Sequence, residues 1–121
     1  MSFQAAKSVV RAHYAALSGA TEASVVDALS AHTTASWQWR GVHPFNTQSG
    51  PGAVADAFWR PLIRAFSRLQ RREDIFFAGK NEIDGFETTW VVSMGHLMGL
   101  HDQPFLGIPA NRKIAMLRYA E

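Results

Sequence analysis

Histidine supplies most of the acid–base chemistry that this sequence could carry at neutral pH. His96 lies in an extended run, residues 86–99, in which every second side chain falls on the same face. His96 shares its face with mainly large, apolar residues, namely Phe86, Thr88, Trp90, Val92, Met94 and Met98. Because this face is the more apolar one, we expect helices to cover it, with His96 pointing inward beside Trp90 and Met94. Such a histidine is either a hydrogen-bonded core residue, which alternation alone favours, or a general acid or base for a bound carbonyl compound.

Two further residues could move a proton. His43 precedes a proline, which favours extended backbone at the edge of a loop, and either an exposed position or a pocket position fits it. Glu121 shares the parity of Leu117 and Tyr119 in the extended run at residues 112–121. A carboxylate in apolar surroundings would have a raised pKa and could shuttle protons. Taken alone, Glu121 is better explained as a surface residue.

The remaining histidines predict no site. His13 shares the apolar face of a helix, where core packing or a helix–helix hydrogen bond is expected, and His32 and His101 are expected in solvent. No histidine pair has the spacing of a helix-borne metal site, and the chain has no cysteine, so we expect no metal. The motifs of a serine nucleophile, a phosphate loop and a dinucleotide site are also missing, so we expect no cofactor.

Three helices are predicted ahead of the strands. Apolar side chains recur at helical spacing between Phe3 and Leu17, so one amphipathic helix should span these residues. A second, short helix is expected after Thr21, and a third from about residue 53 to residue 66. Pro61 lies inside the third helix and lacks a backbone N–H, so we expect a kink or break there.

Alternation predicts four extended segments. Residues 35–40 place Trp37 and Trp39 on one face, and residues 41–52 are expected to form a loop. Longer runs follow at about residues 71–79, 86–99 and 112–121. Helices first and long antiparallel strands afterwards predict a single α+β domain over residues 1–121, with helices on one face of a curved sheet. The alternative is an open two-layer sandwich with no cavity.

Composition and charge exclude several functional classes. The chain has 121 residues and a net charge of +2. Four arginines between Arg64 and Arg72 could neutralise phosphates, but no nucleic-acid-binding motif accompanies them, and a solvated helix end explains them better. No apolar run is long enough to cross a bilayer, and the first residues lack a signal-peptide pattern. We therefore expect no nucleic acid and no membrane as partners, and a cytoplasmic location, with which the absence of cysteine is compatible.

Short motifs in the second half of the chain resemble a known family. GHLMG at residues 95–99, followed by FLGIPA at residues 105–110, resembles the SnoaL-like polyketide cyclases of the nuclear transport factor 2-like superfamily. FWRPL at residues 58–62, with HPFN at residues 43–46 ahead of it, is similar to the ester-cyclase branch of that family. The similarity spans nearly the whole chain. It departs at Asn111, where the family has one residue more, and at Glu121, beyond which members continue into further strand. The domain is therefore expected to be incomplete at its C-terminus, or to have that edge supplied by another chain.

The resemblance implies a fold and a chemistry. The fold is a cystatin-like or nuclear transport factor 2-like cone, in which about three N-terminal helices wrap a curved antiparallel sheet, and members dimerise through the sheet. Characterised cyclases close a polyketide ring by an intramolecular aldol condensation with acid–base residues and no cofactor. On this resemblance, His96 is the family's strand histidine and Glu121 its key carboxylate.

Two functions are compatible with the sequence. The first is a cofactor-independent acid–base enzyme, similar to a polyketide cyclase, an isomerase or an ester cyclase, acting on a small, largely apolar or polyketide-like carbonyl compound. His96 would polarise the carbonyl, and Glu121 or His43 would move the proton. The pocket would be shaped by Tyr14, Trp37, Trp39, Phe58, Trp59, Trp90 and Met94. The second is a non-catalytic module for small-molecule binding or dimerisation. A hydratase or ester hydrolase is a third possibility, since one fold hosts many chemistries.

Overall fold

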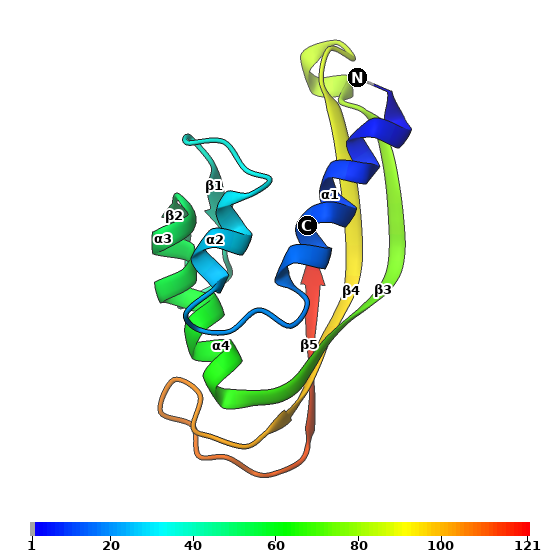
Figure 1. Ribbon diagram of the computed structural model, residues 1–121. Coiled ribbons are helices and arrows are strands. Elements are labelled where there is room, and N and C mark those ends of the chain that lie inside the picture. Colours follow the sequence, from blue (N-terminus) through cyan, green and yellow to red (C-terminus); the bar gives the residue numbers. More distant parts are fainter. Residues whose placement is uncertain (1) are drawn as a thin grey trace.

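The computed structural model describes residues 2–121 as one α+β arrangement, which confirms the predicted class (Figure 1). The elements in chain order are α1 (Phe3–Leu17), α2 (Val25–Ser30), β1 (Gln38–Arg40), β2 (Thr47–Ser49), α3 (Pro51–Val54), η1 (Ala55–Trp59), α4 (Arg60–Ala65), β3 (Phe66–Lys80), η2 (Glu82–Asp84), β4 (Thr89–His101) and β5 (Ile114–Ala120). Strands β3, β4 and β5 form one antiparallel sheet in that order, and β1 and β2 form a separate hairpin. The segment expected to be a loop thus contains β2, and β3 begins five residues earlier than predicted.

The third predicted helix is continuous through Pro61. Segments α3, η1 and α4 follow one another without a break, so of the expected kink or break only an irregular turn before Pro61 is found. The irregularity is the π-helical turn η1, in which the N–H of Arg60 donates to the carbonyl of Ala55, five residues back. A wider turn directly before a proline accommodates the hydrogen bond that the proline cannot make. It leaves both Trp59 and Leu62 facing the core.

Strong curvature of the main sheet comes from two irregularities in β3. The register with β4 shifts between Ser67 and Gln70 and again between Glu73 and Ile75. Gly95 and Gly99 of β4 lie opposite these shifts, where the backbones come very close. A Cβ atom at Gly95 would lie 1.9 Å from the carbonyl oxygen of Arg72. Bulges bend the strand that carries them, and glycine permits the close approach.

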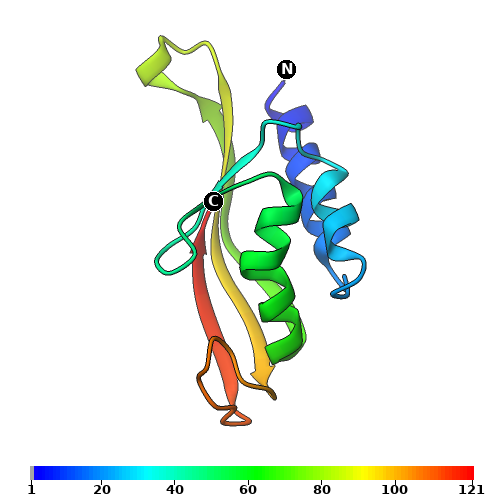
Figure 2. The ribbon, with the colours of Figure 1, turned by 90° about the vertical axis from the view of Figure 1, so that its left-hand side faces the viewer.

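The helices cover the face of β4 opposite to the one predicted (Figure 2). Its buried residues are Ser93, Gly95, Leu97, Gly99 and His101. We call this the inner face and the opposite one, with Trp90, Met94, His96 and Met98, the outer face. The sequence prediction chose the larger side chains, but small residues are needed where helices and bulged backbone approach the sheet closely. His101, which was expected in solvent, is buried and stacks on Phe66 with ring centroids 4.8 Å apart.

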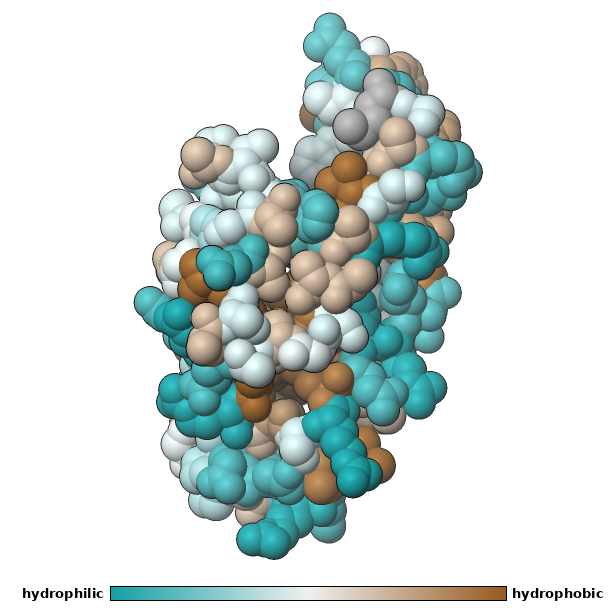
Figure 3. Space-filling view, viewed as in Figure 1, coloured by the Kyte–Doolittle hydropathy of each residue, from teal (hydrophilic) through white to brown (hydrophobic). Residues whose placement is uncertain are grey.

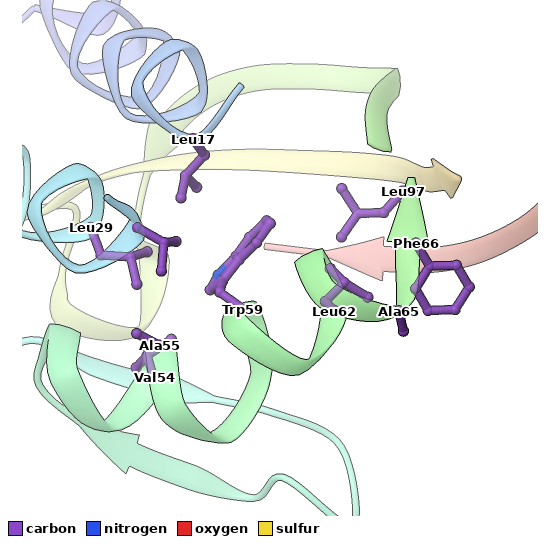
Figure 4. Packing of buried hydrophobic residues seen from close by; sticks show 10 residues of the cluster. Leu17, Leu29, Val54, Ala55, Trp59, Leu62, Ala65, Phe66 and Leu97 are labelled. Atoms are coloured by element: carbon purple, nitrogen blue, oxygen red, sulfur yellow. The ribbon is translucent and has the colours of Figure 1, made fainter. Parts of the chain in front are cut away.

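The hydrophobic core lies between the helices and one end of the inner face (Figure 4). Trp59 is at its centre, 6% exposed, with Leu17 and Leu29 from the first two helices and Leu97 from β4 around it. The full cluster is Leu17, Val25, Leu29, Val54, Ala55, Trp59, Leu62, Ala65, Phe66 and Leu97. Because the core occupies only part of the space over the inner face, the rest is open to a cavity.

Candidate functional site

A main cavity of about 1070 Å³ lies over the inner face, between α1, β5 and the β1–β2 hairpin. This finding excludes the alternative of a sandwich without a cavity. Aromatic side chains from several parts of the chain line it, including Tyr14, Trp37, Trp39, Phe45, Phe58, Trp59 and Phe105, and Trp90 borders it although its register places it on the outer face of β4. Figure 3 shows a notch between the α1 side and the α2–β1 side of the molecule, with hydrophobic residues recessed below it. A half-open cavity with an aromatic wall of this kind suits a flat, apolar molecule.

Tyr14 and Glu121 form the main polar contact of this cavity. The hydroxyl of Tyr14 donates a hydrogen bond to Oε2 of Glu121 over 2.8 Å, joining α1 to the end of the sheet. Glu121 is held in place by Ser93, because the two main chains exchange a pair of 2.8 Å hydrogen bonds that extend the β4–β5 ladder. Next to them, the hydroxyls of Ser93 and Tyr119 are 2.9 Å apart.

Arg71 supplies positive charge to this cluster. Its guanidinium lies over the rings of Tyr14 and Tyr119, 3.6 and 4.5 Å from their centroids. Its Nη1 is 3.5 Å from Oε1 of Glu121, and the side chain is only 11% exposed. Within residues 2–121 this buried Nη1 has no hydrogen-bond partner. A buried cation that is only partly satisfied is expensive, so Arg71 requires an explanation beyond its ion pair with Glu121.

Burial sets the protonation of Tyr14. It raises the pKa of Tyr14 far above the ordinary value, and the negative charge of Glu121 raises it further, against smaller lowering effects of Ser93 and Arg71. Tyr14 therefore keeps its proton and remains a hydrogen-bond donor at any physiological pH.

His13 is a neutral imidazole at the wall of the cavity. Its ring meets the ring of Trp37 edge-on, with centroids 6.3 Å apart. Burial lowers the pKa of His13 most, with smaller contributions from Arg71 and His32, while Glu121 opposes the shift. Its Nδ1 is buried and has no hydrogen-bond partner in the described part of the chain. The expected helix–helix hydrogen bond of His13 is therefore not formed, and the ring lines the cavity instead.

The structure brings most of the predicted pocket residues to the main cavity. Seven of them line it, namely Tyr14, Trp37, Trp39, Phe58, Trp59, Trp90 and Glu121. Met94 is on the outer face and does not line it. His43 is exposed in the β1–β2 loop, where its neighbours Val42 and Phe45 reach the cavity instead.

The inward orientation predicted for His96 is wrong. His96 is on the outer face of β4, and its Nδ1 is 3.6 Å from Oδ2 of Asp74. Arg118 approaches the same carboxylate, at 3.4 Å, so the three side chains form a polar group on the outer face, and of the three only Arg118 borders the cavity. The physical reason is the one given above, namely that glycine and serine, not the larger residues, face the helices.

Among the polar cavity residues described above, the sequence analysis missed His13, Arg71, Ser93 and Tyr119. Tyr119 shares the parity of Glu121, which could have identified it. Arg71 could not be placed by alternation, because two bulges change which residues of β3 face inward.

The described residues hold neither a metal-binding cluster nor a membrane-spanning helix. Residues 2–121 contain no group of three or more histidine or acidic side chains arranged to hold a metal ion. None of the described helices is long and apolar enough to cross a membrane. Comparison of the sequence with models of protein families, with curated proteins and with solved structures finds no match.

Proposed function

We propose that this chain is a cofactor-independent acid–base catalyst, of the cyclase or isomerase kind, acting on a small, largely apolar carbonyl compound in the main cavity. The observation that carries the proposal is the 2.8 Å hydrogen bond between Tyr14 and Glu121 beside an aromatic wall. In this proposal the pair supplies a hydrogen-bond donor and a proton acceptor to one molecule bound in the cavity. The unpartnered Nδ1 of His13 provides a second proton acceptor on the same wall.

The chemistry would begin with a proton on the carbon beside the carbonyl. Glu121 takes this proton, the C–H electron pair forms a carbon–carbon double bond to the carbonyl carbon, the π pair of the carbonyl moves onto its oxygen, and an enolate results. As Glu121 becomes neutral it accepts hydrogen bonds less strongly, so the Tyr14 hydroxyl is free to donate to the enolate oxygen. In an isomerase the proton returns to another carbon. In a cyclase the enolate carbon attacks a second carbonyl of the same molecule, whose oxygen receives the proton.

The fold adds support to the family resemblance. A strongly bent antiparallel sheet with helices on one face and a cavity over that face is what a SnoaL-like, nuclear transport factor 2-like cone requires. In this proposal the catalytic residues are Tyr14, Glu121 and His13. Tyr14 takes the carbonyl-polarising role expected for His96, and His13 takes the proton-accepting role expected for His43.

Hydrogen–deuterium exchange of 2-tetralone, a flat apolar ketone, tests the proposal. The protein should accelerate exchange of the α-hydrogens in D₂O, followed by NMR, above the rate in buffer alone. Glu121→Gln and Tyr14→Phe should each lower the acceleration by about 100-fold or more, since each removes a group that acts only as the enolate forms. His96→Gln, a matched change on the outer face, should leave it unchanged. Binding of 2-tetralone without any accelerated exchange would reject catalysis and favour the second candidate, a non-catalytic binding module.

The outer face favours self-association as an additional property. Large apolar side chains are exposed there at Ile75 (41%), Phe77 (52%), Trp90 (59%), Ile114 (68%) and Met116 (58%). Monomers rarely expose so many large apolar side chains on one face, and we propose that a second copy of the chain covers them. Light scattering should give the mass of a dimer for the unchanged chain and of a monomer for Phe77→Lys. Glu82→Lys, which also adds positive charge but at the η2 turn, should remain dimeric. A monomer mass for the unchanged chain at all concentrations would reject the dimer.

A further inference from the structure

A second cavity, of about 580 Å³, lies between the C-terminal end of α1 and the first half of β3. One part of its wall is apolar and includes Leu17, Ile63 and Leu69. It shares Tyr14, Trp59, Arg71 and Leu97 with the main cavity, so the two cavities meet at these side chains. The shared residues make Arg71 accessible to a molecule in either cavity.

Positive charge dominates the polar part of the second cavity. Arg11, Arg68 and Arg71 line it together with one acidic residue, Glu73. Glu73 is close to Arg11 alone, with 3.8 Å between Oε1 and Nη1, and Arg11 also lies over the ring of Phe76. Three guanidinium groups therefore face a single carboxylate, and the two arginines of β3 are not neutralised by it.

Arg68 and Arg71 both have unused donors. Arg68 makes no side-chain hydrogen bond or ion pair with any of residues 2–121, and it sits in the first register shift of β3 with φ 54°. Arg71 lines both cavities and makes no hydrogen bond with any of residues 2–121; its buried Nη1 lies 3.5 Å from Oε1 of Glu121 on the side of the main cavity, so the donors left for the second cavity are its other guanidinium N–H groups. A guanidinium presents five N–H groups in a planar arrangement that matches a carboxylate, and buried N–H groups are costly when unpaired.

We infer that the second cavity is a binding site for an organic anion, specifically a carboxylate on a short apolar body. The carboxylate accepts hydrogen bonds from Arg68 and Arg71, and the apolar body lies against Leu17, Ile63 and Leu69. An inorganic anion would satisfy the charge but would leave the apolar wall uncovered. The inference does not rest on the chemistry proposed for the main cavity.

Titration of the isotope-labelled chain with 4-phenylbutyrate, followed by NMR, tests this inference. The amide signals of Gly19, Ala20 and residues 67–70 should shift on binding. The uncharged 4-phenylbutyramide and acetate, which lack respectively the charge and the apolar body, should each bind at least about tenfold more weakly.

Substitutions in β3 provide the matched comparison. Arg68→Gln, at an exposed position that the fold does not need, should weaken 4-phenylbutyrate binding about tenfold. Arg72→Gln removes the same charge from the residue next to Arg71, which lines neither cavity, and should leave 4-phenylbutyrate binding unchanged. Equal binding of acid and amide, equal loss in both variants, or shifts confined to Gln38–Gly41 of the main cavity would each overturn the inference. The signals that shift in the unsubstituted chain show which of the two cavities binds 4-phenylbutyrate, even if a variant fails to fold.

Discussion

On the two faces of the β3–β4–β5 sheet, side-chain size and burial are related in the opposite way to the usual one. The inner face of β4 is made of small residues, yet it is the buried one and carries the polar cluster around Glu121. The outer face has the larger apolar side chains, yet Trp90 and Phe77 are more than half exposed. The comparison teaches that in a bent sheet, closeness of approach and not side-chain size decides which face the helices cover.

The largest effect that would test this comparison is expected at Gly95. Gly95→Ala places a Cβ 1.9 Å from the Arg72 carbonyl oxygen, a backbone atom that can move only if the bulge is lost. We expect a loss of more than about 3 kcal/mol in the free energy of unfolding, or no folded protein. Gly79→Ala, where a Cβ would meet no atom within 4 Å, should be neutral or slightly stabilising. Urea unfolding measures both, and equal stabilities would show that Gly95 is not the contact that permits the bend.

Neighbouring residues of β4 give the second effect in size. Leu97 is on the inner face and 5% exposed, and Met98 is on the outer face. Leu97→Ala should cost about 2–4 kcal/mol through lost burial and the cavity it leaves, whereas Met98→Ala should cost about 1 kcal/mol or less. Urea unfolding of the two variants provides the measurement. The reverse order in the monomeric Phe77→Lys background would mean that the outer face is the covered one.

The smallest expected effect is a difference between the two faces in how the free energy of unfolding depends on pH. The pKa of His13 is lowered by burial, so the unfolded chain binds the proton more readily and the folded state loses stability as pH falls below about 6.5. Above that value the contribution is fully present. His13→Gln should therefore flatten the decline in unfolding free energy between pH 7 and pH 5, while Met98→Ala on the outer face, which removes no titratable group, should leave the slope of the decline unchanged. An unaltered slope in His13→Gln would show that His13 is not held neutral by the fold.

Parts of this structure could be predicted from the sequence and parts could not. The α1 periodicity and the long alternating run of β4 predict their elements correctly, because one helix face and one strand face must be buried. The parity of Glu121 with Leu117 and Tyr119 also predicts which way these side chains point, since β5 is regular along its length.

The failures have local physical causes. Alternation cannot be followed through β3, because its two bulges exchange the faces and hide Arg71. His96 was assigned inward by the size of its neighbours, whereas the pattern of Gly95 and Gly99 was the informative signal. The π-helical turn before Pro61 could not be foreseen, because it depends on how Trp59 and Leu62 pack in three dimensions.

The main-chain pair between Ser93 and Glu121 has a consequence for ligand sensing. The carboxylate is tethered to the last hydrogen bonds of β5, which pairs on one side only, with β4, among the described residues. Opening of the main-chain pair between Ser93 and Glu121 would withdraw the acceptor from Tyr14, so closure of this pair and cavity occupancy should favour each other. The amide protons of Ser93 and Glu121 would then exchange with solvent more slowly when the cavity is filled, which makes this strand end a built-in reporter of occupancy.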